Sequence, residues 1–189
     1  MNESPGRLAL LCLFLVWALT AATWVAAEIS VKEVRVRNDR GMLVLDARIG
    51  YGFSEEALEA LDNGVPLTLE VHIQLRSSDA WVWDDSLVDQ RLRYVIRYKP
   101  LSERYLVTQL PGNSGRSYVT RDAAIAALGE IEGLQLVSRK RLQEEEGPFE
   151  IQIKASMDID ELPLPLKPMA YLLPSWKLSS GWTKWPLAP

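Results

Sequence analysis

Cysteine and histidine are almost absent from this chain. Among its 189 residues there is one cysteine, Cys12, and one histidine, His72. A disulfide bond within the chain is therefore impossible, and a zinc site built from several cysteine and histidine ligands is excluded. We accordingly predict no disulfides, no bound metal and no cofactor.

A strong excess of one charge is absent as well. The formal net charge is −4, which argues against a nucleic-acid-binding protein, because such proteins carry basic surfaces. Hydrophobic residues make up 48% of the chain and charged residues 24%. These values are typical of a globular domain and exclude a disordered chain, a collagen or a coiled coil.

The first 27 residues have the three-part pattern of a secretory signal. A short polar stretch ending at Arg7 precedes an almost unbroken apolar run over residues 8–22. Ala26 and Ala27 then precede charged Glu28, which predicts cleavage after Ala27. We therefore expect residues 1–27 to be a signal peptide and residues 28–189 to be one periplasmic domain. The alternative is an uncleaved inner-membrane anchor, since residues 8–27 are long enough to span a bilayer.

Alternation of apolar and polar residues with a period of two dominates the rest of the chain. The pattern indicates strands with one buried and one solvated face, which is typical of antiparallel sheets. A slip of phase at Lys32 and Glu33 predicts a bulge in the first of these strands. The predicted strands cover residues 31–37, 43–49, 67–75, 88–98, 105–110, 134–137 and 149–157.

Two short helices interrupt the predicted strands. They cover residues 54–61, with Ser54 as the N-cap, and residues 120–128, with Thr120 as the N-cap. Both are too short to form a core alone. We predict a mainly β fold, a two-layer antiparallel β-sandwich with two short helices. The alternative is a single curved sheet packed on the helices. In either fold, we expect the charged residues 139–148 to form a hairpin.

The C-terminal residues 161–189 are rich in proline and tryptophan. Pro163, Pro165 and Pro168 argue against a helix, so we predict an extended arm there. Tryptophan suits a lid over the core, a membrane interface or a partner surface. The simpler expectation is that the arm wraps around the sandwich and its tryptophans cover the core. The alternative is a partner-binding site at the tail tryptophans. The tail tryptophans are Trp176, Trp182 and Trp185.

His72 is the one histidine that could act as a catalytic base. The alternation places it on the polar face of its strand, beside Glu70 and Gln74. A Ser-His-Asp site would need this base, but no motif for a nucleophile accompanies it. We expect a surface histidine.

Asp158, Asp160 and Glu161 form an acidic cluster that could bind calcium or hydrolyse a glycoside. In an extended strand, Asp158 and Asp160 share one face. Calcium loops need glycine and more ligands than follow here. We expect a solvated strand end and predict no catalytic residue.

A basic stripe follows one face of the strand predicted at 88–98. Its members are Arg91, Arg93, Arg97 and Lys99. The stripe could meet anionic lipid, a glycan phosphate or an acidic protein. The alternative, which the acidic net charge favours, is cross-strand pairing with carboxylates such as Glu70 or Glu103.

A resemblance to a known family is carried by three segments: LPLPLKPMAYLLPSWKLSSGWTKWPL, FSEEALEALDNGVPLTLEVHIQLR and Trp81-Val82-Trp83-Asp84. They resemble an uncharacterised family of exported proteobacterial proteins, domain-of-unknown-function family 4390, over residues 27–187. The resemblance implies an envelope location and a single domain, and it carries over no catalytic or binding residue. It also implies a genetic association with a nitrogen-regulation-type sensor kinase.

These patterns together favour a non-enzymatic exported envelope protein. We expect a protein-binding or accessory module, with a sensor kinase as a candidate partner. The predicted partner-binding residues are Trp176, Trp182, Trp185, Arg91, Arg93 and Arg97. The alternatives are a lipid- or glycan-binding protein at the membrane surface and a hydrolase using the clustered carboxylates. The sequence leaves the oligomeric state open.

Overall fold

The computed structural model describes residues 27–79, 86–112, 114–145 and 147–187. Residues 1–26, which hold Cys12 and most of the predicted signal peptide, lie outside the described residues. So does the segment from Trp81 to Asp85.

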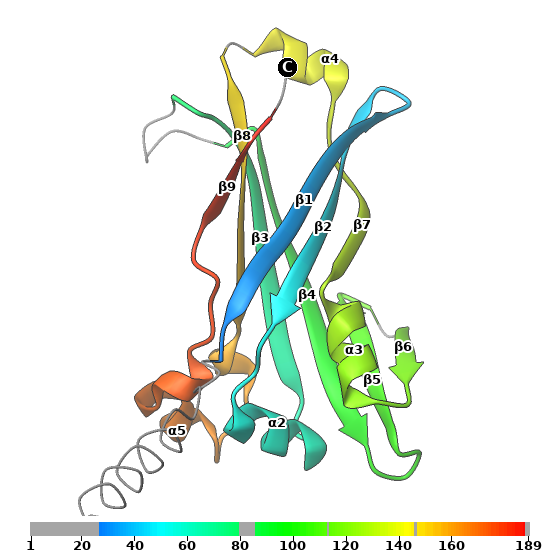
Figure 1. Ribbon diagram of the computed structural model, residues 1–189, viewed down its shortest axis with the longest axis vertical. Helices are drawn as coiled ribbons and strands as arrows, with labels where there is room; N and C mark the ends of the chain where they lie inside the picture. The colour runs from blue at the N-terminus through cyan, green and yellow to red at the C-terminus, as the bar shows by residue number, and fades with distance from the viewer. Residues whose placement is uncertain (1–26, 80–85, 113, 146, 188–189) are drawn as a thin grey trace, which may run out of the picture.

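The described residues form two antiparallel sheets (Figure 1). The smaller sheet has the order β1-β2-β7 and the larger has the order β6-β5-β4-β3-β8-β9. The strands of the smaller sheet are β1 (Ile29–Asp39), β2 (Met42–Tyr51) and β7 (Glu130–Ser138). The strands of the larger sheet are β3 (Leu67–Ser77), β4 (Val88–Lys99), β5 (Arg104–Leu110), β6 (Gly115–Tyr118), β8 (Phe149–Met157) and β9 (Thr183–Pro186).

The core lies between the two sheets. Alternate residues of β3, from Leu67 to Leu75, are completely buried, as are Ile151 and Ile153 of β8. Leu45 and Ile49 of β2 belong to the same core cluster. Facing apolar sides of two sheets bury each other, which confirms the predicted mainly β, two-layer antiparallel fold.

The bulge predicted in the first strand is confirmed, and β1 and β2 form a hairpin. The register of β1 against β2 shifts between Val31 and Glu33, where the bulge is predicted. The turn that follows uses Arg40 and Gly41, which both have positive φ angles of 51° and 81°. Glycine adopts that conformation without strain, which explains Gly41 at this turn.

Both predicted helices are present. In α2 (Glu55–Asp62) the Ser54 hydroxyl accepts a hydrogen bond from the Ala57 amide at 3.2 Å. In α3 (Arg121–Leu128) the Thr120 hydroxyl accepts one from the Ala123 amide at 3.2 Å. These are the N-caps expected from the sequence.

The structure adds two helices that the sequence analysis missed. The charged segment predicted to form a hairpin contains α4 (Arg139–Glu144), capped by the Ser138 hydroxyl. The predicted extended arm contains α5 (Lys167–Leu172). Pro168 lies in the first turn of α5, where the missing N–H costs no helical hydrogen bond. The arm is therefore extended only beyond Trp176, and it ends as the edge strand β9.

Short 3-10 turns flank α5. They are η1 (Ile159–Glu161) and η2 (Pro174–Trp176). No helix in the described part of the chain is both long and apolar enough to cross a membrane. The molecule is elongated, with α2, α5 and the β4–β5 turn at its lower end and α4 at its upper end in Figure 1.

Candidate functional site

The basic stripe of β4 lies on the outer face of the larger sheet, and two of its arginines are paired. Arg93 Nη2 donates to Asp158 Oδ2 at 2.9 Å and to Glu161 Oε1 at 3.0 Å. These bonds, first the one to Glu161, raise the pKa of Arg93 against the effect of its partial burial. Arg91 Nη1 lies 3.5 Å from Glu70 Oε1, which is one of the predicted cross-strand partners.

Arg97, like Arg91, is exposed on this face. It makes no ion pair with another described residue. The face is therefore a mixed network of charges rather than a free basic surface.

The acidic cluster is the counterpart of Arg93. Asp158 and Glu161 hold the guanidinium, and Asp160 accepts a hydrogen bond from the Tyr171 hydroxyl. Residues 159–161 form the turn η1, so the prediction of an extended strand through Asp160 is wrong. The reason is local: the Asp158 carboxylate accepts the Asp160 amide at 3.1 Å and caps the turn. Among the described residues, no group of three or more carboxylate, histidine or cysteine ligands is placed to hold a metal ion.

His72 lies on the same outer face, in a pair with Asp89. The His72 Nε2 to Asp89 Oδ1 distance is 2.7 Å, and Gln74 Nε2 donates to Asp89 Oδ2 at 2.7 Å. Burial works to raise the pKa of Asp89, but the bonds from Gln74 and His72 outweigh it and lower that pKa. The Trp182 ring packs against the imidazole, with ring centroids 4.9 Å apart. These contacts with Asp89 and Trp182 give His72 a structural role in the sheet.

The three tail tryptophans are in three different places. Trp176 in η2 is 4% exposed and belongs to the core, as expected for a lid. Trp182 is 43% exposed on the outer face over His72. Trp185 in β9 points to the opposite side of the sheet, beside Ile151. The structure therefore does not bring the predicted tryptophans into one surface. The other two tryptophans beyond the predicted signal peptide, Trp81 and Trp83, lie outside the described residues.

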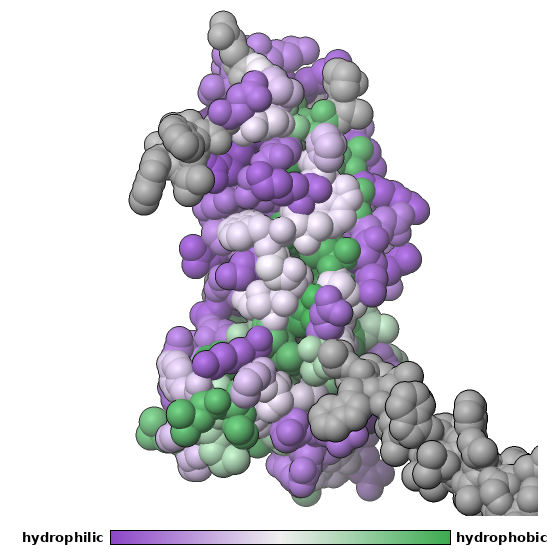
Figure 2. Space-filling view, turned by 60° about the vertical axis from the view of Figure 1, so that its left-hand side comes forward, coloured by the Kyte–Doolittle hydropathy of each residue, from purple (hydrophilic) through white to green (hydrophobic). Residues whose placement is uncertain are grey.

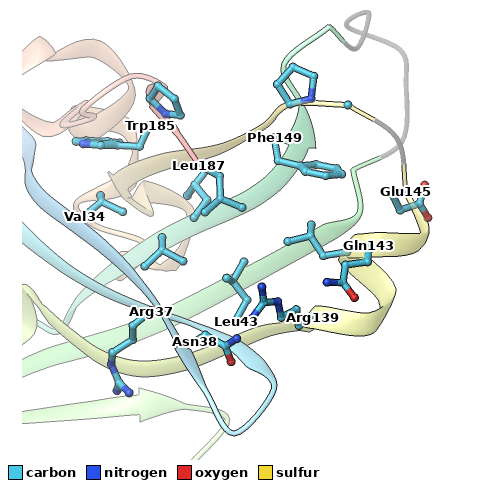
Figure 3. A pocket seen from close by; sticks show the side chains of 16 residues that line it. Val34, Arg37, Asn38, Leu43, Arg139, Gln143, Glu145, Phe149, Trp185 and Leu187 are labelled. Carbon is cyan, nitrogen blue, oxygen red and sulfur yellow. The ribbon is translucent and has the colours of Figure 1, made fainter. Parts of the chain in front are cut away.

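Trp185 borders a cleft between the two sheets at the upper end of the molecule (Figure 3). We call this the inter-sheet cleft; its volume is about 750 Å³. Its apolar walls come from both sheets and from α4. They consist of Val34 and Val36 of β1, Leu43 of β2, Leu142 of α4, Phe149 and Ile151 of β8, Trp185 of β9, and Leu187.

Divergence of the sheets explains the cleft. In Figure 1 the ribbons of β1 and β2 draw apart from those of β3 and β8 toward the β1–β2 turn, whereas Ile29 and Ile49, nearer the lower end, are buried. The wall residues other than Ile151 are therefore only half-buried, although they alternate like core residues. A cleft of this size with apolar walls is within the range that binds ligands or partner side chains.

Polar groups form the rim of the cleft. Arg139, Gln143 and Glu145 are exposed on and after α4. Arg37 is also at the rim, but its Nε donates to Asp46 Oδ2 at 2.9 Å. The rim thus offers charges of both signs around an apolar floor.

The inter-sheet cleft was missed by the sequence analysis. One indication was available, since Leu142 is the single apolar residue in the charged segment 139–145. A lone apolar residue there has to face something apolar, and here it faces the cleft. The divergence of two sheets far apart in the sequence leaves no local pattern.

Comparison with known proteins gives a family but no relative of known activity. No curated protein and no protein of solved structure matches this chain. Residues 26–186 match the family described as a domain of unknown function, DUF4390, which covers all the strands and helices described above. The chain therefore belongs to the DUF4390 family.

Proposed function

We propose that this protein is a non-enzymatic exported envelope protein that binds a partner protein. In this proposal, an extended apolar segment of the partner enters the inter-sheet cleft. The observation that carries it is the apolar cleft itself, which is walled by both sheets and by Trp185. Export rests on the signal-like pattern of residues 1–27.

The edges of the two sheets favour a polypeptide occupant. β1 ends the smaller sheet and β9 ends the larger one, so among the described strands each is paired on one side only. Val34 and Val36 of β1 and Trp185 of β9 line the same cleft. An extended peptide entering there meets unpaired main-chain donors and acceptors as well as apolar walls, which is the basis of strand addition. An acyl chain, by contrast, would contact only the apolar walls of the cleft and not these main-chain groups.

The polar rim would select the flanking residues of such a segment. Arg139 and Glu145 are both exposed beside the opening. Charges at a rim guide register and specificity more than affinity. The gene association implied by the family resemblance makes the extracytoplasmic part of a sensor kinase the first partner to test.

The alternative functions have less support. A lipid or glycan site on the outer face would need several free arginines, yet Arg91 and Arg93 are paired with carboxylates, which leaves only Arg97 of the predicted set without an ion pair to a described residue. A hydrolase would need free carboxylates, yet Asp158 and Glu161 serve as partners of Arg93. Each of these paired side chains would first have to release its present partner before it could bind a ligand or act on a substrate.

Site-specific photo-crosslinking in cells tests the proposal. A photoreactive phenylalanine analogue is placed at Leu187, inside the cleft, and in a matched variant at Arg97, on the outer face. We expect one discrete protein adduct from position 187, mapping to an extended apolar segment, and none from position 97. Equal adducts from both positions, or a lipid adduct at position 187, would contradict the proposal.

A further inference from the structure

Exposed apolar side chains gather at the lower end of the molecule. Figure 2 shows hydrophobic residues exposed there, below a mostly polar surface. Among the described residues, the large exposed apolar side chains at this end are Leu101, Leu164, Met169, Tyr171, Leu172 and Leu173. We call them the lower-end surface. Leu101, Leu172 and Leu164 are 105%, 80% and 79% exposed.

Two separate parts of the chain build this surface. Leu101 lies in the turn between β4 and β5, and the others lie in and around α5. Both parts are at the same end of the long axis in Figure 1. Solvent-exposed apolar tips from two unrelated segments at one end indicate a surface that contacts something apolar.

The helix α5 is anchored from beneath. Ala170 on its inner side is completely buried, and Leu162 just before it is 2% exposed. Met169 and Leu172 point the other way and are 54% and 80% exposed. The helix is thus held in place by one side and presents the other side to the surroundings, as interfacial helices do.

The N-terminal sequence identifies what this end meets. β1 begins at Ile29 at the lower end (Figure 1). The apolar run over residues 8–22 ends five residues before Ala27, a distance that a fully extended chain spans in about 17 Å. An apolar run of this kind enters a bilayer both as a secretory signal and as an anchor. A bilayer is therefore close to the lower end while residues 1–27 are attached, which is until the predicted cleavage after Ala27, or permanently in the uncleaved-anchor alternative.

We propose that the lower-end surface rests on the lipid bilayer, with Leu101, Leu164 and Leu172 inserted among the headgroups. The inter-sheet cleft lies at the opposite end of the long axis, so it would open away from the membrane (Figures 1 and 3). This inference does not depend on what binds in the cleft.

Lipid-borne quenching tests the contact directly. The single cysteine is replaced by Cys12→Ser, and one environment-sensitive fluorophore is attached through Leu172→Cys. The matched control carries it through Gln143→Cys, on α4 at the upper end. Both proteins are used as purified from expressing cells, with vesicles of phosphatidylcholine and phosphatidylglycerol that contain nitroxide lipids.

We expect quenching at position 172 to exceed that at position 143 severalfold. Because the contact is apolar, the difference should persist at about 0.5 M salt, where exposed charges are screened. Equal quenching at the two positions, or none at position 172, would overturn the proposal. Loss of the quenching in salt would also overturn it, since that result points to charge-driven binding. Both substituted positions are exposed, and circular dichroism checks that the fold is intact.

Discussion

Trp185 of β9 lies directly opposite Ile151 of β8 in the antiparallel register, and both side chains border the inter-sheet cleft. Ile151 is completely buried, whereas Trp185 is half-buried. The pair therefore marks the point where the closed core of the sandwich opens into the cleft. Because β9 is an edge strand, Trp185 is accessible to a partner.

Truncation of Trp176 should lower stability much more than truncation of Trp182. Trp176→Ala removes a side chain that is 4% exposed in the core, and we expect a loss of about 3 to 5 kcal/mol of unfolding free energy. Trp182→Ala removes a ring that is 43% exposed and should cost about 1 kcal/mol or less. Urea unfolding of both variants measures the difference. Equal losses would show that Trp182 is as much a part of the core as Trp176.

Arg93 should matter for stability and Arg97 should not. Arg93→Ala breaks the bonds to Asp158 and Glu161 and leaves the two carboxylates facing each other. Since the Arg93 side chain is 34% exposed, solvent screening limits the expected loss to about 1 kcal/mol. Arg97→Ala should leave the thermal midpoint unchanged. A similar drop in both variants would contradict a specific contribution from the ion pairs of Arg93 with Asp158 and Glu161.

Asp46 should contribute stability at neutral pH and lose it in acid. Its carboxylate accepts the Gly133 amide at 2.7 Å and the Arg37 Nε at 2.9 Å. The bond from Gly133, followed by the bond from Arg37, lowers the pKa of Asp46. A group with a lowered pKa in the folded state stabilises fully above its unfolded pKa of about 4 and loses this contribution as the pH falls through the folded pKa.

The matching experiment compares Asp46→Asn with the wild type over a range of pH. We expect the variant to be less stable by about 1 kcal/mol at pH 7, a figure reduced for the partial exposure of the site. The gap should stay constant down to about pH 4 and close below it. Asp39→Asn is the control, because its carboxylate lies 3.7 Å from Arg37 and is 54% exposed. A gap that closes between pH 7 and 5 would contradict the lowered pKa.

Intact-mass analysis of the protein from expressing cells tests the predicted signal peptide. We expect the mature chain to begin at Glu28, because Ala26 and Ala27 provide the small residues that a signal peptidase requires. A blocking variant, Ala27→Tyr, should leave residues 1–27 attached. A wild-type chain that retains Met1 would instead support the uncleaved anchor.

The sequence predicts the strands well where the alternation is clean. The predicted strand 67–75 corresponds to β3 and 149–157 corresponds to β8, because each has one face in the core and one in solvent. Both helix starts are also predicted correctly, since Ser54 and Thr120 act through their immediate neighbours. Local chemistry decides these features, so local patterns reveal them.

The sequence fails where tertiary packing overrides a local preference. Pro168 led to the prediction of an extended arm, but it stands in the first turn of α5, where proline is tolerated. The partners of Arg93 are 65 and 68 positions away, and the Asp46 carboxylate bonds an amide 87 positions away. The inter-sheet cleft arises from the divergence of two sheets, which no single segment encodes.

The central claim is that a partner segment binds in the inter-sheet cleft against Trp185. The most direct measurement is a calorimetric titration of the segment identified by crosslinking at position 187, made as a synthetic peptide, into three proteins. These are the wild type, Trp185→Ala and the control Lys184→Ala, which changes the adjacent side chain on the opposite face of β9. The account predicts at least tenfold weaker binding for Trp185→Ala and nearly unchanged binding for Lys184→Ala, because a buried aromatic anchor carries most of the affinity. Equal affinities for all three proteins would contradict it.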